Sequence, residues 1–206
     1  MKAVEQSLTK SDLLKNPFDQ FGLWFTQAKN KGELEPSAMT LATVNANYDV
    51  TARMLLLKSF DENGFVFFTN YDSPKAQALT QIPKAAMVFW WPLLLRQVRI
   101  TGNVVLLDST QSDNYFASRS KNSRLAAIAS KQSEVIPNRE TLIEQFQAQK
   151  KRYENIDDIP RPAFWGGYVL IPHTIEFWQG REHRLHDRFE YRKDAAGAWH
   201  IVQLSP

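Results

Sequence analysis

The spacing of apolar residues changes along this chain, and each spacing predicts a different kind of element. Five apolar residues near the start recur at helical spacing: Phe18, Phe21, Trp24, Phe25 and Ala28. Asn16 and Pro17 stand just before them, as an N-cap and a first helical residue do. The sequence therefore predicts a helix from this point, with its aromatic stripe in the core. Residues 1–15 show no such pattern, and we expect them to be poorly ordered.

From residue 37 onward, short runs rich in β-branched and aromatic residues predict strands. The expected strands cover 38–45, 50–58, 65–69, 85–91, 96–107, 164–171, 174–178, 186–192 and 199–204. Helical patterns occupy the ranges 73–81, 109–119, 123–130 and 138–153. Short strands joined by turns, with helices at the periphery, predict an α+β fold that is mainly β and forms an antiparallel barrel. No linker divides the chain, so we expect one domain over residues 16–206.

The absence of cysteine removes several kinds of chemistry at once. Without a thiol the chain can form no disulfide, thiolate zinc site or cysteine nucleophile. The first residues are polar and mixed in charge, unlike a signal peptide, and the longest apolar runs are far too short to cross a bilayer. We therefore expect a cytoplasmic protein that does not associate with a membrane.

Glycine content and charge narrow the range of ligands. The chain has 8 glycines, and no two of them stand in a GxG arrangement. Dinucleotide-binding loops and Walker loops both need glycines so that the backbone can approach a phosphate, so side chains would have to hold any phosphate here. The formal net charge of +3 is too small to indicate a nucleic-acid partner.

The densest polar cluster covers residues 179–188. His183 and His186 have the spacing of metal ligands on a helix, but their flanks resemble strands, where an odd separation sends side chains to opposite faces. No third His or Cys lies nearby, and we expect no metal. On a strand, Arg184, His186 and Arg188 would share one face, and such a group favours a bound anion. A solvated basic edge strand is the alternative.

Other side chains could also hold an anion. Tyr115, Arg119 and Ser123 would share one face of a continuous helix and could hold a phosphate there, and a solvated helix face is the alternative. Lys75 stands at a helix start, where backbone N–H groups favour anions.

A straight strand would separate two further cations. Arg53 and Lys58 flank an apolar run and would lie on opposite faces, so both could serve one site only across a bulge or from a strand end. Taken alone, this segment is more typical of a buried strand with a charge at each end. None of these patterns selects the anion.

The C-terminal cluster does point to a family. The segment Ile175-Glu176-Phe177-Trp178-Gln179, followed after four residues by Arg184-Leu185-His186-Asp187-Arg188, resembles the C-terminal signature of the pyridoxamine 5′-phosphate oxidase family. Other stretches agree in order: Arg53 to Lys58, Phe68 to Asn70, Arg96 to Val98, Tyr115 to Arg119, Ser130 to Ser133 and Phe164 to Gly167. The resemblance extends from about Pro17 to Pro206.

This resemblance implies a split-barrel fold, a homodimer and FMN bound non-covalently at the dimer interface. It implies that oxygen oxidises pyridoxine or pyridoxamine 5′-phosphate to pyridoxal 5′-phosphate, with release of hydrogen peroxide and, from the amine, ammonia. The implied FMN contacts are Arg53, Met54, Leu55, Leu56, Leu57, Lys58, Phe68, Thr69, Lys75, Gln97, Gln132, Ser133, Trp178 and Arg188. The implied substrate contacts are Lys58, Tyr115, Arg119, Ser123, Arg184 and His186, and the last two are the implied catalytic pair at the substrate ring.

The chain departs from the family at two places. Pro74 stands where the family usually has an arginine that binds phosphate, and residues 1–15 do not match the family's N-terminal segment that covers the substrate. Two other functions stay open: a flavin-binding split barrel without vitamin B6 oxidase activity, and a carrier that binds pyridoxal phosphate and passes it on.

Overall fold

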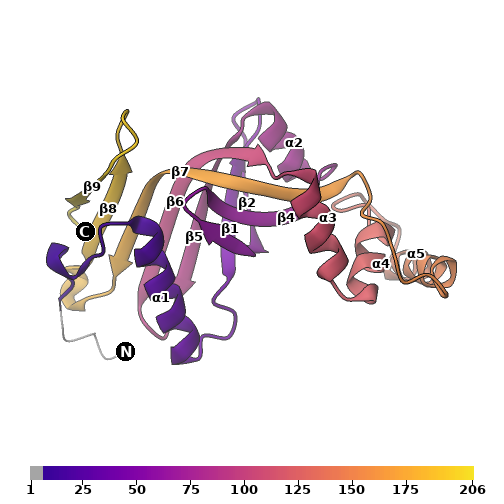
Figure 1. Ribbon diagram of the computed structural model, residues 1–206, viewed down its shortest axis with the longest axis horizontal. Helices are drawn as coiled ribbons and strands as arrows, with labels where there is room; N and C mark the ends of the chain where they lie inside the picture. The colour runs from indigo at the N-terminus through magenta and orange to yellow at the C-terminus, as the bar shows by residue number, and fades with distance from the viewer. Residues whose placement is uncertain (1–6) are drawn as a thin grey trace.

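One antiparallel sheet forms the centre of the computed structural model, which describes residues 7–206 (Figure 1). Its nine strands are β1 (Ala38–Val44), β2 (Val50–Leu56), β3 (Ser59–Asp61), β4 (Gly64–Asn70), β5 (Lys84–Trp91), β6 (Arg96–Leu106), β7 (Trp165–Gln179), β8 (Asp187–Lys193) and β9 (Trp199–Gln203). They lie in the order β2-β1-β5-β6-β7-β4-β3, while β8 pairs with β7 and β9 pairs with β8. The prediction of an antiparallel, mainly β architecture is confirmed.

The longest strand, β7, connects the two parts of the sheet. The sequence predicts two strands here, over 164–171 and 174–178, and this is wrong because β6 pairs with β7 along its whole length across one register shift. Gly102 permits that shift, since a Cβ atom there would lie 2.1 Å from the carbonyl oxygen of Ile171. β4 pairs with the first part of β7 and β8 with the last part. The two ends of β7 therefore belong to different parts of the molecule.

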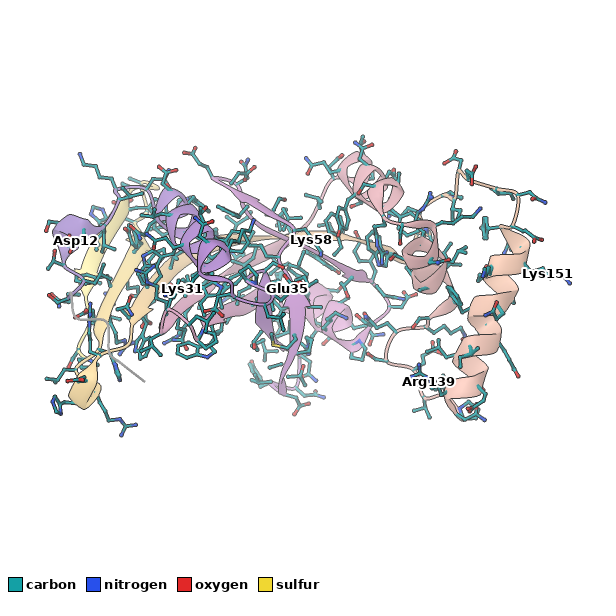
Figure 2. The ribbon with its side chains drawn as sticks, turned by 90° about the horizontal axis from the view of Figure 1, so that it is seen from below. Asp12, Lys31, Glu35, Lys58, Arg139 and Lys151 are labelled. Atoms are coloured by element: carbon teal, nitrogen blue, oxygen red, sulfur yellow. The ribbon has the colours of Figure 1, made fainter. Side chains whose placement is uncertain are left out.

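Within the described residues, five α-helices lie around the sheet: α1 (Pro17–Lys31), α2 (Pro74–Gln81), α3 (Ser109–Ser118), α4 (Lys121–Ala129) and α5 (Arg139–Arg152). Helices α2 to α5 each begin and end within two residues of the predicted range, and α1 begins where the sequence predicts. Figure 1 shows α1 beside the sheet towards one end of the elongated molecule, and α3, α4 and α5 gathered at the other end. Figure 2 shows the same separation from a perpendicular direction, with Asp12 near one end and Lys151 near the other.

Helix α1 begins and packs as its sequence predicts. The side-chain oxygen of Asn16 accepts the Phe18 backbone N–H at 2.8 Å, which caps the first turn. The Phe21 ring is fully buried and lies edge-on to the rings of Phe65 and Phe89, with centroids 5.0 Å away in both cases. The prediction that this aromatic stripe belongs to the core is confirmed.

The segment before α1 contacts the sheet. Residues 1–6 lie outside the described residues, so they do not test the prediction made for residues 1–15. Residues 7–15 pack on the sheet, where the Tyr191 hydroxyl donates to the Leu14 carbonyl at 2.6 Å. This contact with a residue far along the chain leaves no trace in the local pattern, and the prediction about the order of the segment stays a prediction.

Candidate functional site

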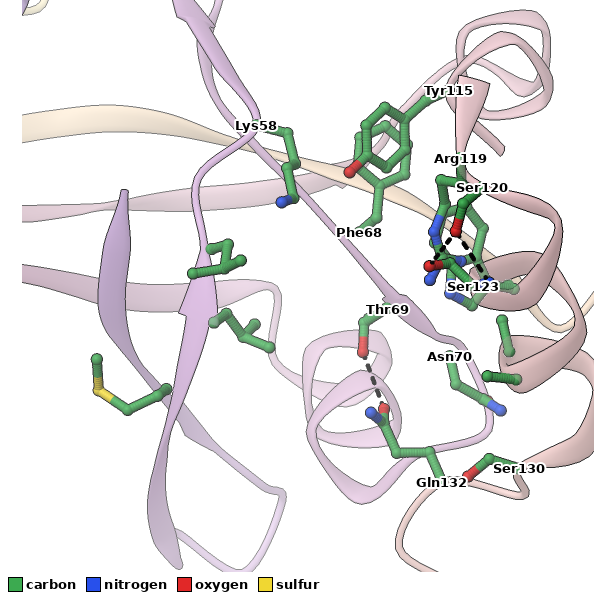
Figure 3. Close-up of a pocket in the computed structure, with 16 residues that line it drawn as sticks. Lys58, Phe68, Thr69, Asn70, Tyr115, Arg119, Ser120, Ser123, Ser130 and Gln132 are labelled. Atoms are coloured by element: carbon green, nitrogen blue, oxygen red, sulfur yellow. Dashed lines mark hydrogen bonds between the residues drawn. The ribbon is translucent and has the colours of Figure 1, made fainter. Parts of the chain in front are cut away.

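A cavity of about 640 Å³ opens between the sheet and helices α3 and α4 (Figure 3). Its walls come from the end of β2, from β4, α3 and α4, and from the first residue of β7. The lining residues are Met54, Leu55, Leu56, Lys58, Phe68, Thr69, Asn70, Tyr115, Arg119, Ser120, Ser123, Ala126, Ala127, Ser130, Gln132 and Trp165. The structure thus brings together residues that the family resemblance assigns to the cofactor and residues that it assigns to the substrate.

Arg119 is arranged to bind an anion in this cavity. Its guanidinium carbon lies 4.8 Å from the centre of the Trp165 ring, and its Nη1 is buried without a hydrogen-bond partner among residues 7–206. Burial lowers the pKa of Arg119. Ser120 and Ser123 place hydroxyl groups on the same wall, 2.8 Å from one another. A buried N–H without an acceptor costs about 1–3 kcal/mol, so this arrangement favours a ligand that accepts from it.

Tyr115, Arg119 and Ser123 reach the cavity by a different route from the predicted one. Helix α3 ends one residue before Arg119, which is extended with φ −74° and ψ 150°. The continuous helix that would align the three side chains is therefore absent. The turn between α3 and α4 brings them to the cavity instead, where the Tyr115 ring stacks on Phe68 with centroids 3.9 Å apart.

A buried lysine, Lys75, lies outside the cavity lining and contacts it through Gln132. The Lys75 side chain is 5% exposed, and its Nζ donates to Ser73 Oγ at 2.9 Å and to Gln132 Oε1 at 2.5 Å. No carboxylate among the described residues pairs with it. Burial, and secondarily the nearby charge of Arg53, lower the pKa of Lys75 to about 8. Two neighbouring cations without a counter-ion favour an anionic ligand, and Thr69 adds a hydroxyl that donates to Gln132 at 3.1 Å.

Arg53 and Lys58 can contribute to the same region because β2 ends between them. The Arg53 guanidinium donates to the Leu41 carbonyl at 3.0 Å and lies near Lys75, whereas Lys58 lines the cavity. β2 ends at Leu56, after which the Lys58 backbone N–H donates to the Val66 carbonyl of β4 at 2.9 Å. The chain has left the strand before Lys58, so the rule of opposite faces does not apply to this pair.

Two further residues that the resemblance assigns to FMN, Leu57 and Ser133, do not line the cavity. The Leu57 side chain is 5% exposed and packs in the hydrophobic core, away from the cavity lining. Ser133 is exposed and has a left-handed φ of 71°, and it also lies outside the lining. The resemblance assigns both to FMN, and the cavity alone does not bring their side chains to a ligand.

A second group of expected ligand residues lies in one row across the sheet. Gln97 of β6 stands directly opposite Trp178 of β7, and Trp178 stands directly opposite Arg188 of β8. Trp90 of β5 extends this row because it pairs with Gln97, and its ring lies 6.0 Å from that of Trp178. Residues directly opposite in neighbouring strands share one face of the sheet, so this row forms a continuous surface.

The segment before β8 is a turn, although the sequence predicts that Arg184, His186 and Arg188 share one strand face. That prediction is wrong: residues Glu182–Arg184 form a 3₁₀ turn, and β8 begins only at Asp187. His183 and Arg184 have left-handed φ angles of 54° and 63°, which no strand contains. The turn leaves Arg184 exposed instead of aligning it with Arg188.

His186 nevertheless joins the row of residues on the sheet. Its ring lies 4.5 Å from the Trp178 ring, and its Nδ1 is 3.0 Å from the Arg181 backbone nitrogen. Because a backbone N–H can only donate, Nδ1 accepts, and the neutral ring carries its proton on Nε2. His186 therefore offers an N–H donor on its outer edge.

The cavity and this row lie at opposite ends of β7. Trp165 lines the cavity at the start of the strand, and Trp178 lies near the strand's end. At about 3.3 Å per residue, the intervening strand spans up to about 40 Å. Along β7, the row is therefore well separated from Trp165.

Sequence reasoning overlooks several residues that complete these surfaces: Asn70, Ser120, Ser130 and Trp165 at the cavity, and Trp90 in the row. Trp165 stands in a stretch that carries the family resemblance, so a signal for it exists. The pairing of Trp90 with Gln97 depends on strand register and has no local signal. Among residues 7–206, no three His, Asp or Glu side chains come together to hold a metal ion, and no helix is long and apolar enough to cross a membrane.

Comparison with known proteins identifies relatives along nearly the whole chain. The family profile described as "Pyridoxamine 5′-phosphate oxidase" matches residues 25–152, and the profile "Pyridoxine 5′-phosphate oxidase C-terminal dimerisation region" matches residues 165–206. A protein of Gloeothece citriformis named "Pyridoxine/pyridoxamine 5′-phosphate oxidase" is 54% identical over 97% of this chain and 92% of its own length. A protein of Cupriavidus pinatubonensis with the same name is 48% identical over 97% of this chain and 93% of its own length.

Two solved structures share the fold. PhzG from Burkholderia lata, solved with tetrahydrophenazine-1-carboxylic acid, superposes with a TM-score of 0.92 and 29% sequence identity, over 100% of both chains. An FMN-binding protein from Nostoc punctiforme that is related to pyridoxamine 5′-phosphate oxidase has a TM-score of 0.73 and 19% identity, over 94% of this chain and 100% of its own.

Proposed function

The chain belongs to the pyridoxamine 5′-phosphate oxidase family, and from this premise we propose that it oxidises pyridoxine or pyridoxamine 5′-phosphate to pyridoxal 5′-phosphate with oxygen. From the alcohol, two hydrogens pass to oxygen and give hydrogen peroxide. From the amine, one water is also consumed and ammonia leaves. The observation that carries the proposal is the unpartnered Arg119 Nη1 beside the Ser123 hydroxyl in the cavity, because a phosphate would accept hydrogen bonds from both groups.

The cofactor is FMN, and the residues present fit it. The Lys75 ammonium is buried against neutral acceptors and near the Arg53 charge, which is the environment that an FMN phosphate would neutralise. Gln132 and Thr69 would complete this phosphate site, and we call Lys75, Arg53, Gln132 and Thr69 together the Lys75 cradle. Lys75 lies in the first turn of α2, whose N-terminus also favours an anion. When bound, FMN supplies hydride acceptance and the transfer of electrons to oxygen, and the protein supplies binding and orientation.

We assign the substrate phosphate to Arg119, Tyr115 and Ser123, and the pyridine ring to Arg184 and His186. The Nε2–H of His186 would donate a hydrogen bond to a ring substituent, since its Nδ1 already accepts from the Arg181 backbone. Arg184 would lie against the ring and fix its orientation. Stacked aromatic rings behind Arg119 hold the phosphate end rigid, which is how a substrate is kept in a reactive position.

We propose that the working unit is a homodimer with FMN at the interface. Trp178, Arg184, His186 and Arg188 all fall within residues 165–206, which match the profile named for dimerisation. They lie at or beyond the end of β7, whereas Trp165 at its start lines the cavity of their own chain. A second copy that brings its row against this cavity would unite the two groups in one site. Each dimer would then contain two equivalent sites.

One experiment separates this function from its alternatives. The purified protein is examined for flavin absorption and then mixed in air with pyridoxine 5′-phosphate, while pyridoxal phosphate and hydrogen peroxide are followed together. We expect both products to accumulate in equal amounts over many turnovers. A carrier would release at most one equivalent of pyridoxal phosphate and no peroxide.

The similarity to PhzG calls for a second arm with an unphosphorylated substrate. Pyridoxine, which lacks the phosphate, should be a much poorer substrate because Arg119 would keep its unpaired N–H. Equal rates with pyridoxine and its phosphate would refute the assignment of Arg119. A flavoprotein that oxidises neither compound would be a split barrel with another substrate.

A further inference from the structure

Glu176 is a buried carboxylate that the proposed function does not use. It lies in β7, and its side chain is 4% exposed. Each of its oxygens pairs with a different arginine: Oε1 lies 2.8 Å from Arg188 Nε, and Oε2 lies 3.1 Å from Arg99 Nη1. The three residues come from three adjacent strands, so the contact exists only in the assembled sheet.

Stability alone is a weak reason for such a cluster. Removing two or three charges from water costs more than their attraction commonly returns, and apolar residues of similar size often replace buried ion pairs without loss. Arg99 is half exposed, whereas Glu176 and Arg188 are much less so. The cluster therefore needs an explanation other than the free energy of folding.

Arg188 is held by two separate acceptors. Its Nε donates to Glu176, and its Nη1 donates to the Ser205 carbonyl at 2.8 Å. Its Nη2 has no acceptor among residues 7–206. The hydrogen bond to Glu176 raises the pKa of Arg188. A planar guanidinium fixed at two nitrogens can present its remaining edge in only one direction.

Arg188 is part of the row that Gln97 and Trp178 form across the sheet. Arg188 stands opposite Trp178, and Glu176 is two residues before Trp178 on the same face of β7, so Glu176 reaches Arg188 along the diagonal. We propose that Glu176 is a positioning residue for the cofactor: it orients the Arg188 guanidinium so that its free edge meets FMN. This inference rests on the proposed function, which assigns Arg188 to FMN.

The test is a double-mutant cycle read by FMN affinity. The variants Glu176→Gln, Arg188→Ala and their combination are stripped of flavin, and the dissociation constant of FMN is measured from the quenching of its fluorescence. We expect each single change to weaken FMN about tenfold or more, the scale of a lost charge-assisted hydrogen bond. In the Arg188→Ala background, Glu176→Gln should add less than about twofold, because its effect passes through Arg188.

Glu190→Gln is the matched control. Glu190 stands directly opposite Glu176 on β8 and pairs with Arg192 at 2.5 Å, so the same change is made one strand away. It should leave the FMN dissociation constant within about twofold. If Glu176→Gln does not fold, Glu176→Met/Arg188→Met is compared with Arg188→Met alone, since the double variant removes both charges of this pair and leaves only the half-exposed Arg99 without its partner.

Three results would overturn the inference. Additive losses from Glu176→Gln and Arg188→Ala would mean that Glu176 acts on the fold and not through Arg188. An unchanged FMN affinity in Glu176→Gln would mean that Ser205 alone orients Arg188. Normal oxidation of pyridoxine 5′-phosphate together with unchanged FMN affinity in Arg188→Ala would refute this role while the proposed function stands.

Discussion

Replacing Lys75 with methionine should make the flavin-free protein more stable and the flavin complex weaker. The Lys75 ammonium is buried with only neutral acceptors, and its pKa falls from 10.5 to about 8. A shift of this size corresponds to about 3 kcal/mol that the fold loses at pH 7 by keeping the charge. Methionine fills a similar volume and removes that cost, while two hydrogen bonds worth about 1 kcal/mol each disappear. We expect a net gain of about 1 kcal/mol.

FMN affinity should change in the opposite direction. The phosphate of FMN would lose a charge-assisted hydrogen bond worth about 1.5–3 kcal/mol, which corresponds to roughly 10- to 100-fold in the dissociation constant. Urea unfolding of flavin-free protein at one fixed concentration gives the first quantity, and fluorescence titration with FMN gives the second. Lys84→Met is the control, because Lys84 is an exposed lysine at the start of β5 and should change neither quantity appreciably.

The direction in which stability and FMN affinity change with pH tests the same reasoning. Because the pKa of Lys75 is lowered on folding, the unfolded chain holds this proton more tightly, and the stability of flavin-free protein should rise with pH between about 8 and 10.5. FMN needs the charged form, so its affinity should fall above pH 8, by up to about tenfold per pH unit. Both trends should vanish in Lys75→Met. A Lys75→Met variant that is less stable than the wild type and still binds FMN equally well would refute the idea that the buried Lys75 charge destabilises the flavin-free fold and binds the FMN phosphate.

The remaining predictions concern individual contacts. Arg119→Met should raise KM for pyridoxine 5′-phosphate by about 100-fold in steady-state kinetics without changing FMN content, since it removes a phosphate contact and leaves the Lys75 cradle intact. Pro74→Arg, at the exposed first residue of α2, should tighten FMN about tenfold in a titration, and an unchanged dissociation constant would mean that other groups already satisfy the phosphate. His186→Asn keeps a polar side chain and should impair substrate binding more than flavin content, so loss of the flavin absorbance would contradict its assignment to the substrate.

The sequence by itself determines the local elements and the family of this protein. The cap at Asn16 and the aromatic stripe that follows it specify α1 and its buried face, because both signals act within a few residues. Helices α2 to α5 follow their local patterns in the same way. The number of residues between Glu176 and Arg188 is fixed by the sequence, so the family resemblance can be recognised without knowing the fold.

Only the tertiary structure decides which of these residues meet. The left-handed turn at His183 and Arg184 breaks the strand that local pattern predicts, and the Arg181 backbone, not a strand partner, fixes His186. β7 continues through Pro172 because β6 stays paired to it across a shift that Gly102 permits. Strand register is a property of pairs of segments, and one segment read alone cannot reveal it.

The candidate site shows the same division. The sequence supplies Tyr115, Arg119 and Ser123 at a suggestive spacing, yet a turn between two helices, and no continuous face, brings them to the cavity. The diagonal contact of Glu176 with Arg188 and the unpaired N–H of Arg119 depend on burial, which arises only when strands and helices pack. The residue types determine which chemistry is available, but contacts between segments far apart in the chain set the distances between these side chains.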